Sequence, residues 1–190
     1  MRPHPATTPS SARSLSAGAA AAAGCAVLLA RPQLLRASAN PTATVVIIFV
    51  ALLAVGLAWP VAREHAGAVR TTAFAVGLGI IAFAIGRLIG GGTAPASPTA
   101  KIVALNTLAA VGEEAFFRRF VFDTLVPSGP ALAVAGSALL FALVHLTVYG
   151  AWVLPIDLAA GLLLGWQRWV TGSWHAPAIT HAFANLLVVI

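Results

Sequence analysis

Long apolar runs, separated by short segments that hold basic residues or prolines, dominate the chain and decide what it can fold into. The clearest run, 42–62, contains no charged residue and matches the roughly 20 apolar residues needed to cross a bilayer. Hydrophobic residues occupy 59% of the 190 positions and charged residues only 8%, whereas soluble domains carry about 25% charged residues. A soluble fold of this size could not bury so much apolar surface. We therefore predict an integral membrane protein.

The apolar runs predict an all-α fold, a polytopic transmembrane helix bundle of about seven spans. The predicted spans are residues 15–30, 42–62, 71–86, 102–122, 131–149, 152–166 and 174–190. The polar segment 1–14 is predicted to be a disordered tail, because it is rich in proline, serine and threonine. Residues 15–99 are then N-terminal transmembrane helices, and residues 100–190 form the core that carries the polar motifs.

The basic residues indicate membrane topology. The chain has a net charge of +6, but its eleven basic residues are scattered, whereas a nucleic-acid-binding groove would concentrate them. We therefore predict no nucleic-acid partner. With seven spans, seven basic residues fall on the side of the N-terminus and four on the other side, which favours a cytoplasmic N-terminus. We expect a multi-pass protein of the plasma membrane.

A cleaved signal peptide is the alternative interpretation of the first apolar run, because Ala37-Ser38-Ala39 has the small residues of a cleavage site. That site lies beyond Arg31 and Pro32, well past the apolar run, so we prefer a retained span. Cys25 is the only cysteine, which excludes an intrachain disulfide. It lies in the same apolar run, and we expect a packed, inert thiol.

Charged residues inside a predicted span are costly and usually face the protein interior. Glu114 and Arg118 are four residues apart, so on a helix they share a face and can pair. Glu113 points about 100° away and has no partner within its own turn. One carboxylate would then be neutralised while its neighbour stays free for chemistry. The alternative is a helix end at the headgroups, where these side chains are simply solvated.

Two further spans carry polar side chains. His145 lies deep in an uncharged run, where a hydrogen-bonded packing role is the alternative to catalysis. His181 and Asn185 are four apart and share a face of the last span, where an interhelical hydrogen-bond pair is the alternative. Asp157 and Thr180 are candidate further partners. The spacing of Gly161 and Gly165 is typical of close helix packing.

Taken together, these spans hold the components of hydrolysis. A carboxylate and an imidazole can activate a water molecule, and an imidazole and an amide can donate to a developing oxyanion. The sequence contains neither a GxSxG nor an HExxH motif, which argues against serine-type and ordinary zincin chemistry.

The order of three motifs resembles the CPBP (CAAX protease and bacteriocin-processing) intramembrane protease family, which includes type II CAAX prenyl endopeptidases. The motifs are Glu113-Glu114-x-x-x-Arg118, Phe141-x-x-x-His145 and His181-x-x-x-Asn185. The resemblance covers roughly residues 100–190 and makes this part a CPBP-like catalytic transmembrane core. It implies an intramembrane endopeptidase that acts on membrane-associated peptide or protein substrates, with prenylated CAAX proteins as one substrate class.

The resemblance also implies roles for the motif residues. Glu113 would be the general base, assisted by His145, and His181 and Asn185 would line the oxyanion site. Glu114 and Arg118 would fix the helix or a substrate carboxylate. Zinc held by Glu113, His145 and His181 is the alternative to a metal-free mechanism. We favour no bound metal, because the chain has only five acids to orient ligating histidines.

Two other functions fit the same residues. A transporter or proton relay would also place acids and histidines inside a membrane. A non-catalytic family member could act as an immunity or scaffold protein. In every case the polar side chains of apolar spans must find one another or water. We therefore expect Glu113, His145, His181 and Asn185 to converge on one cavity.

Overall fold

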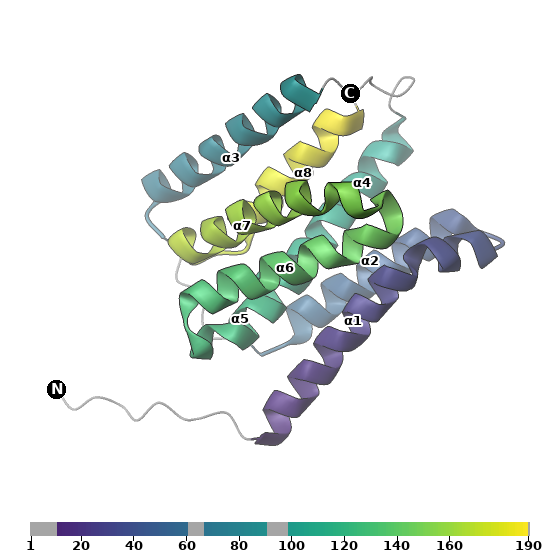
Figure 1. Cartoon of the computed structure of the whole chain (residues 1–190), viewed down its shortest axis with the longest axis horizontal. Coiled ribbons are helices and arrows are strands. Elements are labelled where there is room, and N and C mark those ends of the chain that lie inside the picture. Colours follow the sequence, from purple (N-terminus) through teal and green to yellow (C-terminus); the bar gives the residue numbers. More distant parts are fainter. Residues whose placement is uncertain (1–10, 61–66, 91–98, 190) are drawn as a thin grey trace.

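The computed structural model describes residues 11–60, 67–90 and 99–189, and all its regular elements in these ranges are helices (Figure 1). The all-α prediction is confirmed. The main helices are α1 (Ser11–Ala37), α2 (Pro41–Ala58), α3 (Val69–Gly90), α4 (Ala100–Glu114), α6 (Pro130–Tyr149), α7 (Leu154–Thr171) and α8 (His175–Val189). A π-helical segment, η1 (Ala115–Val121), and the short helix α5 (Phe122–Leu125) prolong α4. Single 3₁₀ turns, η2 (Val126–Ser128) and η3 (Ala151–Val153), precede α6 and α7.

The helices pack in two layers. In Figure 1, α7, α6 and α1 lie in front of α8, α4 and α2, and α3 lies at the edge against α7 and α8. The run formed by α4, η1 and α5 contacts α2, α6, α7 and α8, so it is enclosed within the bundle. The acids of the sequence motif are therefore carried by the most enclosed helix.

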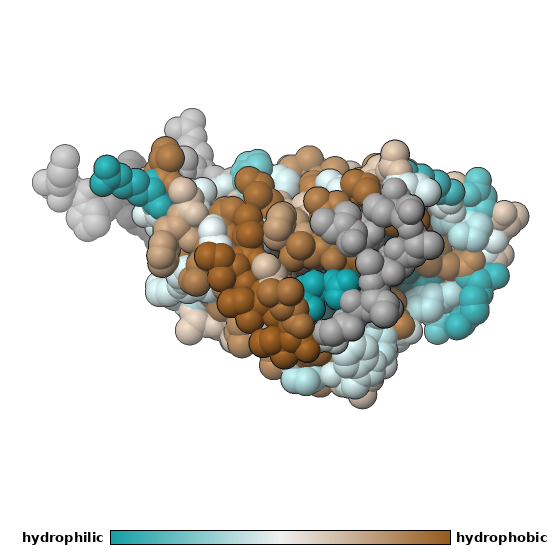
Figure 2. Space-filling view, turned by 90° about the horizontal axis from the view of Figure 1, so that it is seen from above, coloured by the Kyte–Doolittle hydropathy of each residue, from teal (hydrophilic) through white to brown (hydrophobic). Residues whose placement is uncertain are grey.

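The outer surface is apolar, as a bilayer requires. Large side chains such as Phe74, Leu88 and Ile89 are exposed by 67%, 81% and 82%. Figure 2 shows a broad apolar area on one face, interrupted by a small hydrophilic patch near its centre. Four helices are long and apolar enough to cross a membrane, namely α1 from Ser14, α2, α3 and α6. The chain is an integral membrane protein, and four of the seven predicted spans meet this criterion among the described residues.

Several predicted span ends differ from the helix ends. The first helix begins at Ser11 and continues through Arg31 and Pro32 to Ala37, beyond the predicted end at residue 30. An arginine and a proline there indicated a loop, but the charge of Arg31 is matched inside the bundle by an ion pair with Glu113. Arg118, one of the seven basic residues counted on the side of the N-terminus, is fully buried and therefore carries no information on topology. The cytoplasmic N-terminus therefore stays a prediction.

Glycines bring the helix backbones close together at three contacts. A Cβ at Gly112 would lie 2.7 Å from the carbonyl oxygen of Phe49, and one at Gly161 would lie 2.9 Å from the Cα of Ala138. Gly165 likewise faces α6, so the predicted packing role of this glycine pair is confirmed. A Cβ at Gly56 would overlap the backbone of Ala115 at the start of η1.

We expect Gly56→Ala to destabilise the bundle, because the added methyl group meets backbone atoms that cannot move away. Overpacking typically costs about 1–3 kcal/mol and outweighs the gain of about 1 kcal/mol in helix propensity. The measurement is the melting temperature in detergent. Gly77→Ala is the matched control, because a Cβ there meets nothing within 4 Å. Equal melting temperatures for the two variants would contradict the packing argument.

Candidate active site

The paired acids end α4, and the next seven residues form a π-helix, in which hydrogen bonds join residues five apart. π-Helical turns are rare and frequent at functional sites. Here nearly every residue of η1 is buried, including Phe116, Phe117 and Phe120, because helices surround this segment on all sides. The π-helix, which is wider than an α-helix, therefore lies where its side chains pack against several neighbouring helices.

Glu114 and Arg118 form the ion pair that their spacing predicts. Arg118 Nη1 donates to Glu114 Oε1 at 3.0 Å, and both side chains are completely buried. The guanidinium also donates from Nη2 to the Gly161 carbonyl at 3.3 Å and lies 4.4 Å from the centre of the Phe141 ring. His181 Nδ1 lies 2.8 Å from the same Glu114 oxygen. The pair thus connects α4 and η1 to α6, α7 and α8.

Glu113 points to a different set of partners. Its side chain is 4% exposed, and its Oε2 lies 3.9 Å from Nε2 of His145 and 3.9 Å from Nε2 of His181. These separations are too long for direct hydrogen bonds and leave room for one bridging oxygen atom. Oε1 lies 3.6 Å from Arg31 Nη1 of α1. The structure therefore places Glu113 between two imidazoles and a guanidinium.

Contacts of both histidines at Nδ1 fix their tautomers. His145 Nδ1 lies 2.7 Å from the Phe141 carbonyl, which can only accept, so this nitrogen carries the proton. His181 Nδ1 faces the carboxylate of Glu114, which likewise requires a donor. In their neutral forms both residues therefore direct an accepting Nε2 toward Glu113. His181 can donate from Nε2 only as an imidazolium.

Asn185 is partly engaged elsewhere. Its Nδ2 donates to the backbone carbonyl of Asn106 at 3.1 Å and so joins α8 to α4. One amide hydrogen is therefore used for packing, as the interhelical alternative predicted, and one is left for the site. Thr180, considered as a further partner, accepts from Gln167 Nε2 at 3.0 Å instead, so its expected place in the site is wrong.

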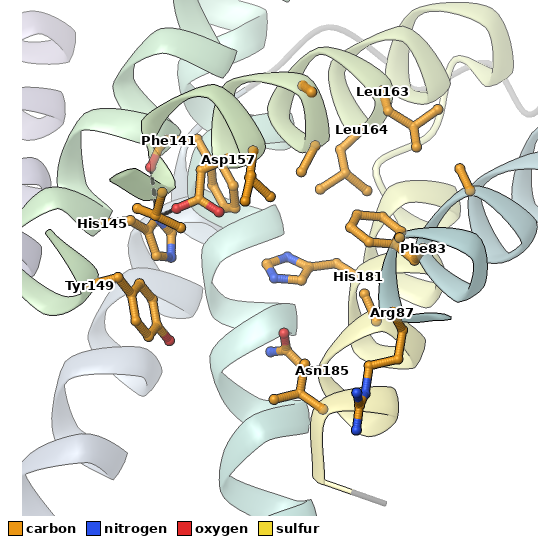
Figure 3. Close-up of a pocket in the computed structure, with 18 of the residues that line it drawn as sticks. Phe83, Arg87, Phe141, His145, Tyr149, Asp157, Leu163, Leu164, His181 and Asn185 are labelled. Carbon is orange, nitrogen blue, oxygen red and sulfur yellow. Dashed lines mark hydrogen bonds and ion pairs between the residues drawn. The ribbon is translucent and has the colours of Figure 1, made fainter. Parts of the chain in front are cut away.

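A cavity of about 850 Å³ opens between α3, α6, α7 and α8. Its walls are mostly apolar, and His145, Asp157, His181 and Asn185 provide polar groups. Figure 3 shows the imidazoles of His145 and His181 turned toward the space between them. Glu113 does not line this cavity but reaches both histidines from α4. The four predicted catalytic residues thus converge, three at the cavity wall and one directly behind it.

The sequence did not predict one neighbour of these residues. Arg31 was assigned to a loop, although an unpaired Glu113 inside the membrane favours a basic partner. Asp157, considered as a further partner, lines the same cavity as both histidines, and its Oδ2 lies 3.9 Å from His145 Nδ1. Among the described residues this oxygen has no hydrogen-bond partner.

The side chains around Glu113 are the candidate ligands for a metal ion. Among the described residues no group of three or more His, Cys, Asp or Glu side chains is arranged to hold a metal ion. Zinc ligands at about 2.0–2.1 Å from the ion lie roughly 3.4 Å apart in a tetrahedral site. The two 3.9 Å separations around Glu113 are wider than this. The residues as arranged therefore do not fit zinc.

One argument against zinc was nevertheless wrong. The five acids of the chain suggested that carboxylates able to orient the histidines are scarce. Glu114 in fact orients His181 through Nδ1, and the Phe141 carbonyl orients His145. Such contacts also accompany metal-bound histidines, because they fix the ring and its tautomer.

A comparison with known families identifies the C-terminal half. The family model described as type II CAAX prenyl endopeptidase Rce1-like matches residues 95–187. This range contains all three sequence motifs and leaves out α1, α2 and α3. The resemblance to the CPBP family is thereby confirmed. No curated protein and no solved structure matches the chain.

We expect Glu114→Ala to lower both folded yield and melting temperature. It leaves the buried charge of Arg118 without its partner, which typically costs about 3–5 kcal/mol, and it removes the acceptor of His181. The measurements are monodisperse yield after size exclusion and thermal unfolding in detergent. The double variant Glu114→Gln/Arg118→Met should recover stability, because it removes both charges. A Glu114→Ala protein as stable as the wild type would refute a structural role for this pair.

Proposed function

We propose that this protein is an intramembrane endopeptidase, because residues 95–187 match the Rce1-like type II CAAX prenyl endopeptidase family. It hydrolyses peptide bonds of membrane-associated substrates with a water molecule activated by Glu113 and His145. The observation that carries this proposal is the position of Glu113, whose Oε2 lies 3.9 Å from the Nε2 atoms of both histidines. A water oxygen in that gap would be within hydrogen-bond distance of all three groups.

The reaction begins with proton removal from this water. Its oxygen forms a bond to the scissile carbonyl carbon while Glu113 takes a proton, and the carbonyl electrons move onto the oxygen. The C–N bond then breaks, its electron pair stays on nitrogen, and the proton passes from Glu113 to the leaving amine. His145 assists because its neutral Nε2 accepts a hydrogen bond from the same water. His181, when protonated, and the remaining amide hydrogen of Asn185 donate hydrogen bonds to the oxyanion.

The cavity favours a lipidated substrate. Its volume of about 850 Å³ lies within the usual range for ligand sites, and its walls between α3 and α7 are mostly apolar. A prenyl chain would find apolar side chains there, whereas the peptide would reach the histidines. We therefore propose a peptide or protein ending in a prenylated CAAX sequence as the substrate class. The bilayer supplies the second partner, because the apolar outer surface is solvated by lipid.

A proton relay is the second candidate, because acids and imidazoles alternate through the site. Asp157, His145, Glu113, His181 and Glu114 follow one another at separations of 3.9 Å or less. Such a chain is also typical of ion pathways in membranes. Proton flux that persists in liposomes when peptide hydrolysis is lost would favour this candidate.

We expect Glu113→Gln to abolish turnover and to preserve the fold. The amide keeps the shape of the side chain but cannot take a proton, so kcat should fall by about 10²–10⁴-fold. The assay is cleavage of an internally quenched peptide ending in a farnesylated Cys-aliphatic-aliphatic-Met sequence, with purified protein in detergent. His145→Gln should also lose activity, whereas His175→Gln, which changes an exposed histidine outside the cavity, serves as control. Full activity of folded Glu113→Gln protein would refute the mechanism.

We expect hydrolysis to proceed without a bound metal. The same peptide should be cleaved at an unchanged rate in protein purified without metal-affinity resin and incubated with a strong chelator. Elemental analysis of the same sample should find well below one zinc per chain. Near-stoichiometric zinc, together with activity that is lost on chelation and restored by zinc, would make Glu113, His145 and His181 metal ligands.

A further inference from the structure

A residue outside the matched family region reaches the reaction centre. Arg31 lies on α1, which precedes the match at residues 95–187. Its Nη1 lies 3.6 Å from Oε1 of Glu113, and its side chain is 13% exposed. The guanidinium also lies 5.6 Å from the centre of the Phe49 ring of α2. The first two helices therefore hold a positive charge beside the proposed general base.

The donors of this guanidinium are not used within the described part of the chain. The side chain of Arg31 makes no hydrogen bond to a described residue, and its only ion pair there is the one to Glu113, although its charge also acts on Tyr149. Arg118 differs, because it is completely buried and donates to Glu114 and to a backbone carbonyl. Arg31 thus has N–H groups that are free to donate hydrogen bonds to a substrate. It lies beside Oε1 of Glu113, whereas both histidines lie beside Oε2.

Apart from Arg31, the predicted oxyanion residues offer one preformed donor, the remaining amide hydrogen of Asn185. Neutral His181 directs an accepting nitrogen toward Glu113, because its proton is held at Nδ1 by Glu114. Asn185 uses one of its amide hydrogens on the Asn106 carbonyl. Hydrolysis of a peptide bond needs donors placed in advance at the developing oxyanion, and this is usually the largest catalytic contribution.

We propose that Arg31 is a catalytic residue that donates hydrogen bonds to the oxyanion of the tetrahedral intermediate. The inference rests on the proposed function. When Glu113 takes the proton from water, its negative charge disappears and a negative charge arises on the former carbonyl oxygen. Arg31 lies beside Glu113 and neutralises it at rest, and in the proposed intermediate its unused donors turn to the oxyanion. The net charge around it stays constant, which matters in a medium where an unpaired charge is costly.

A substrate's terminal carboxylate is a less suitable partner for Arg31. In a CAAX sequence that carboxylate lies three residues beyond the bond after the cysteine, or up to about 10 Å away in an extended chain. Arg31 Nη1 lies only 3.6 Å from the proposed base, which must itself be near the scissile bond. The guanidinium is therefore placed for the reacting carbonyl.

The test compares kcat and KM of Arg31→Gln and Arg31→Lys with the wild type, using the farnesylated quenched peptide. We expect Arg31→Gln to lower kcat by about 10²–10³-fold with little change in KM, as for other oxyanion donors. Arg31→Lys should retain an intermediate kcat, because it keeps the charge but loses the planar fork. Arg36→Gln, an exposed arginine five residues further along α1, is the matched control and should behave as wild type.

Three outcomes would overturn the inference. Wild-type kcat in folded Arg31→Gln protein excludes the role directly. If Arg31→Gln folds poorly, Arg31→Lys carries the test, and a wild-type kcat in that variant excludes a dependence on the guanidinium. A defect that disappears with a peptide amidated at its C-terminus would assign Arg31 to the terminal carboxylate. By contrast, cleavage that is equal in wild type and Glu113→Gln protein refutes the proposed function itself.

Discussion

The buried ion pair between Glu114 and Arg118 is the interaction on which the arrangement of the site depends. Two charges that are completely removed from solvent cost several kcal/mol each unless partners surround them. The partners come from three other helices: His181 from α8, the Gly161 carbonyl from α7 and the Phe141 ring from α6. Arg168 of α7 adds a hydrogen bond to the Arg118 carbonyl. Satisfying one ion pair therefore fixes the positions of the helices that carry the chemistry.

The pair also explains why two adjacent glutamates have different surroundings. They differ by one helical step, so one points into the closed core and the other toward the gap between the histidines. Glu114 holds His181 at Nδ1, while Glu113 faces Nε2 of the same ring. The imidazole is thus oriented by one carboxylate and presented to the other. In Ser-His-Asp triads a carboxylate likewise fixes the tautomer and orientation of a histidine.

The sequence predicted those side-chain arrangements that depend only on the spacing of residues within one helix. Residues four apart on a helix must share a face, so the Glu114–Arg118 pair and the common face of His181 and Asn185 followed from the sequence alone. The apolar runs and the order of the motifs likewise predicted the fold class and the family. Span ends were less predictable. Helix α1 continues past Arg31 and Pro32, because the charge of Arg31 is paired with Glu113 inside the bundle.

Contacts between helices that are distant in the sequence could not be predicted from residue spacing. Nothing in the sequence of α1 indicates that Arg31 meets Glu113, because that contact depends on how the helices pack. The amide of Asn185 could reach any nearby acceptor, and only the packed structure shows that Asn106 provides it. The π-helix was also hidden, since Ala115–Val121 has ordinary helix-forming composition and widens only within its crowded surroundings.

The N-terminal helices are more than an anchor for the family core. Gly56 of α2 gives Ala115 room at the start of η1, and Gly24 of α1 lies under the ring of Phe116. Through these contacts α1 and α2 pack against the segment that directly follows the two glutamates. The same helices bring Arg31 to Glu113, which among the described residues also lies near the imidazoles of His145 and His181. A core limited to residues 95–187 would hold the three motifs but would lack this ion pair with α1. The surroundings of Glu113 therefore include a charge from a helix that carries none of the motifs.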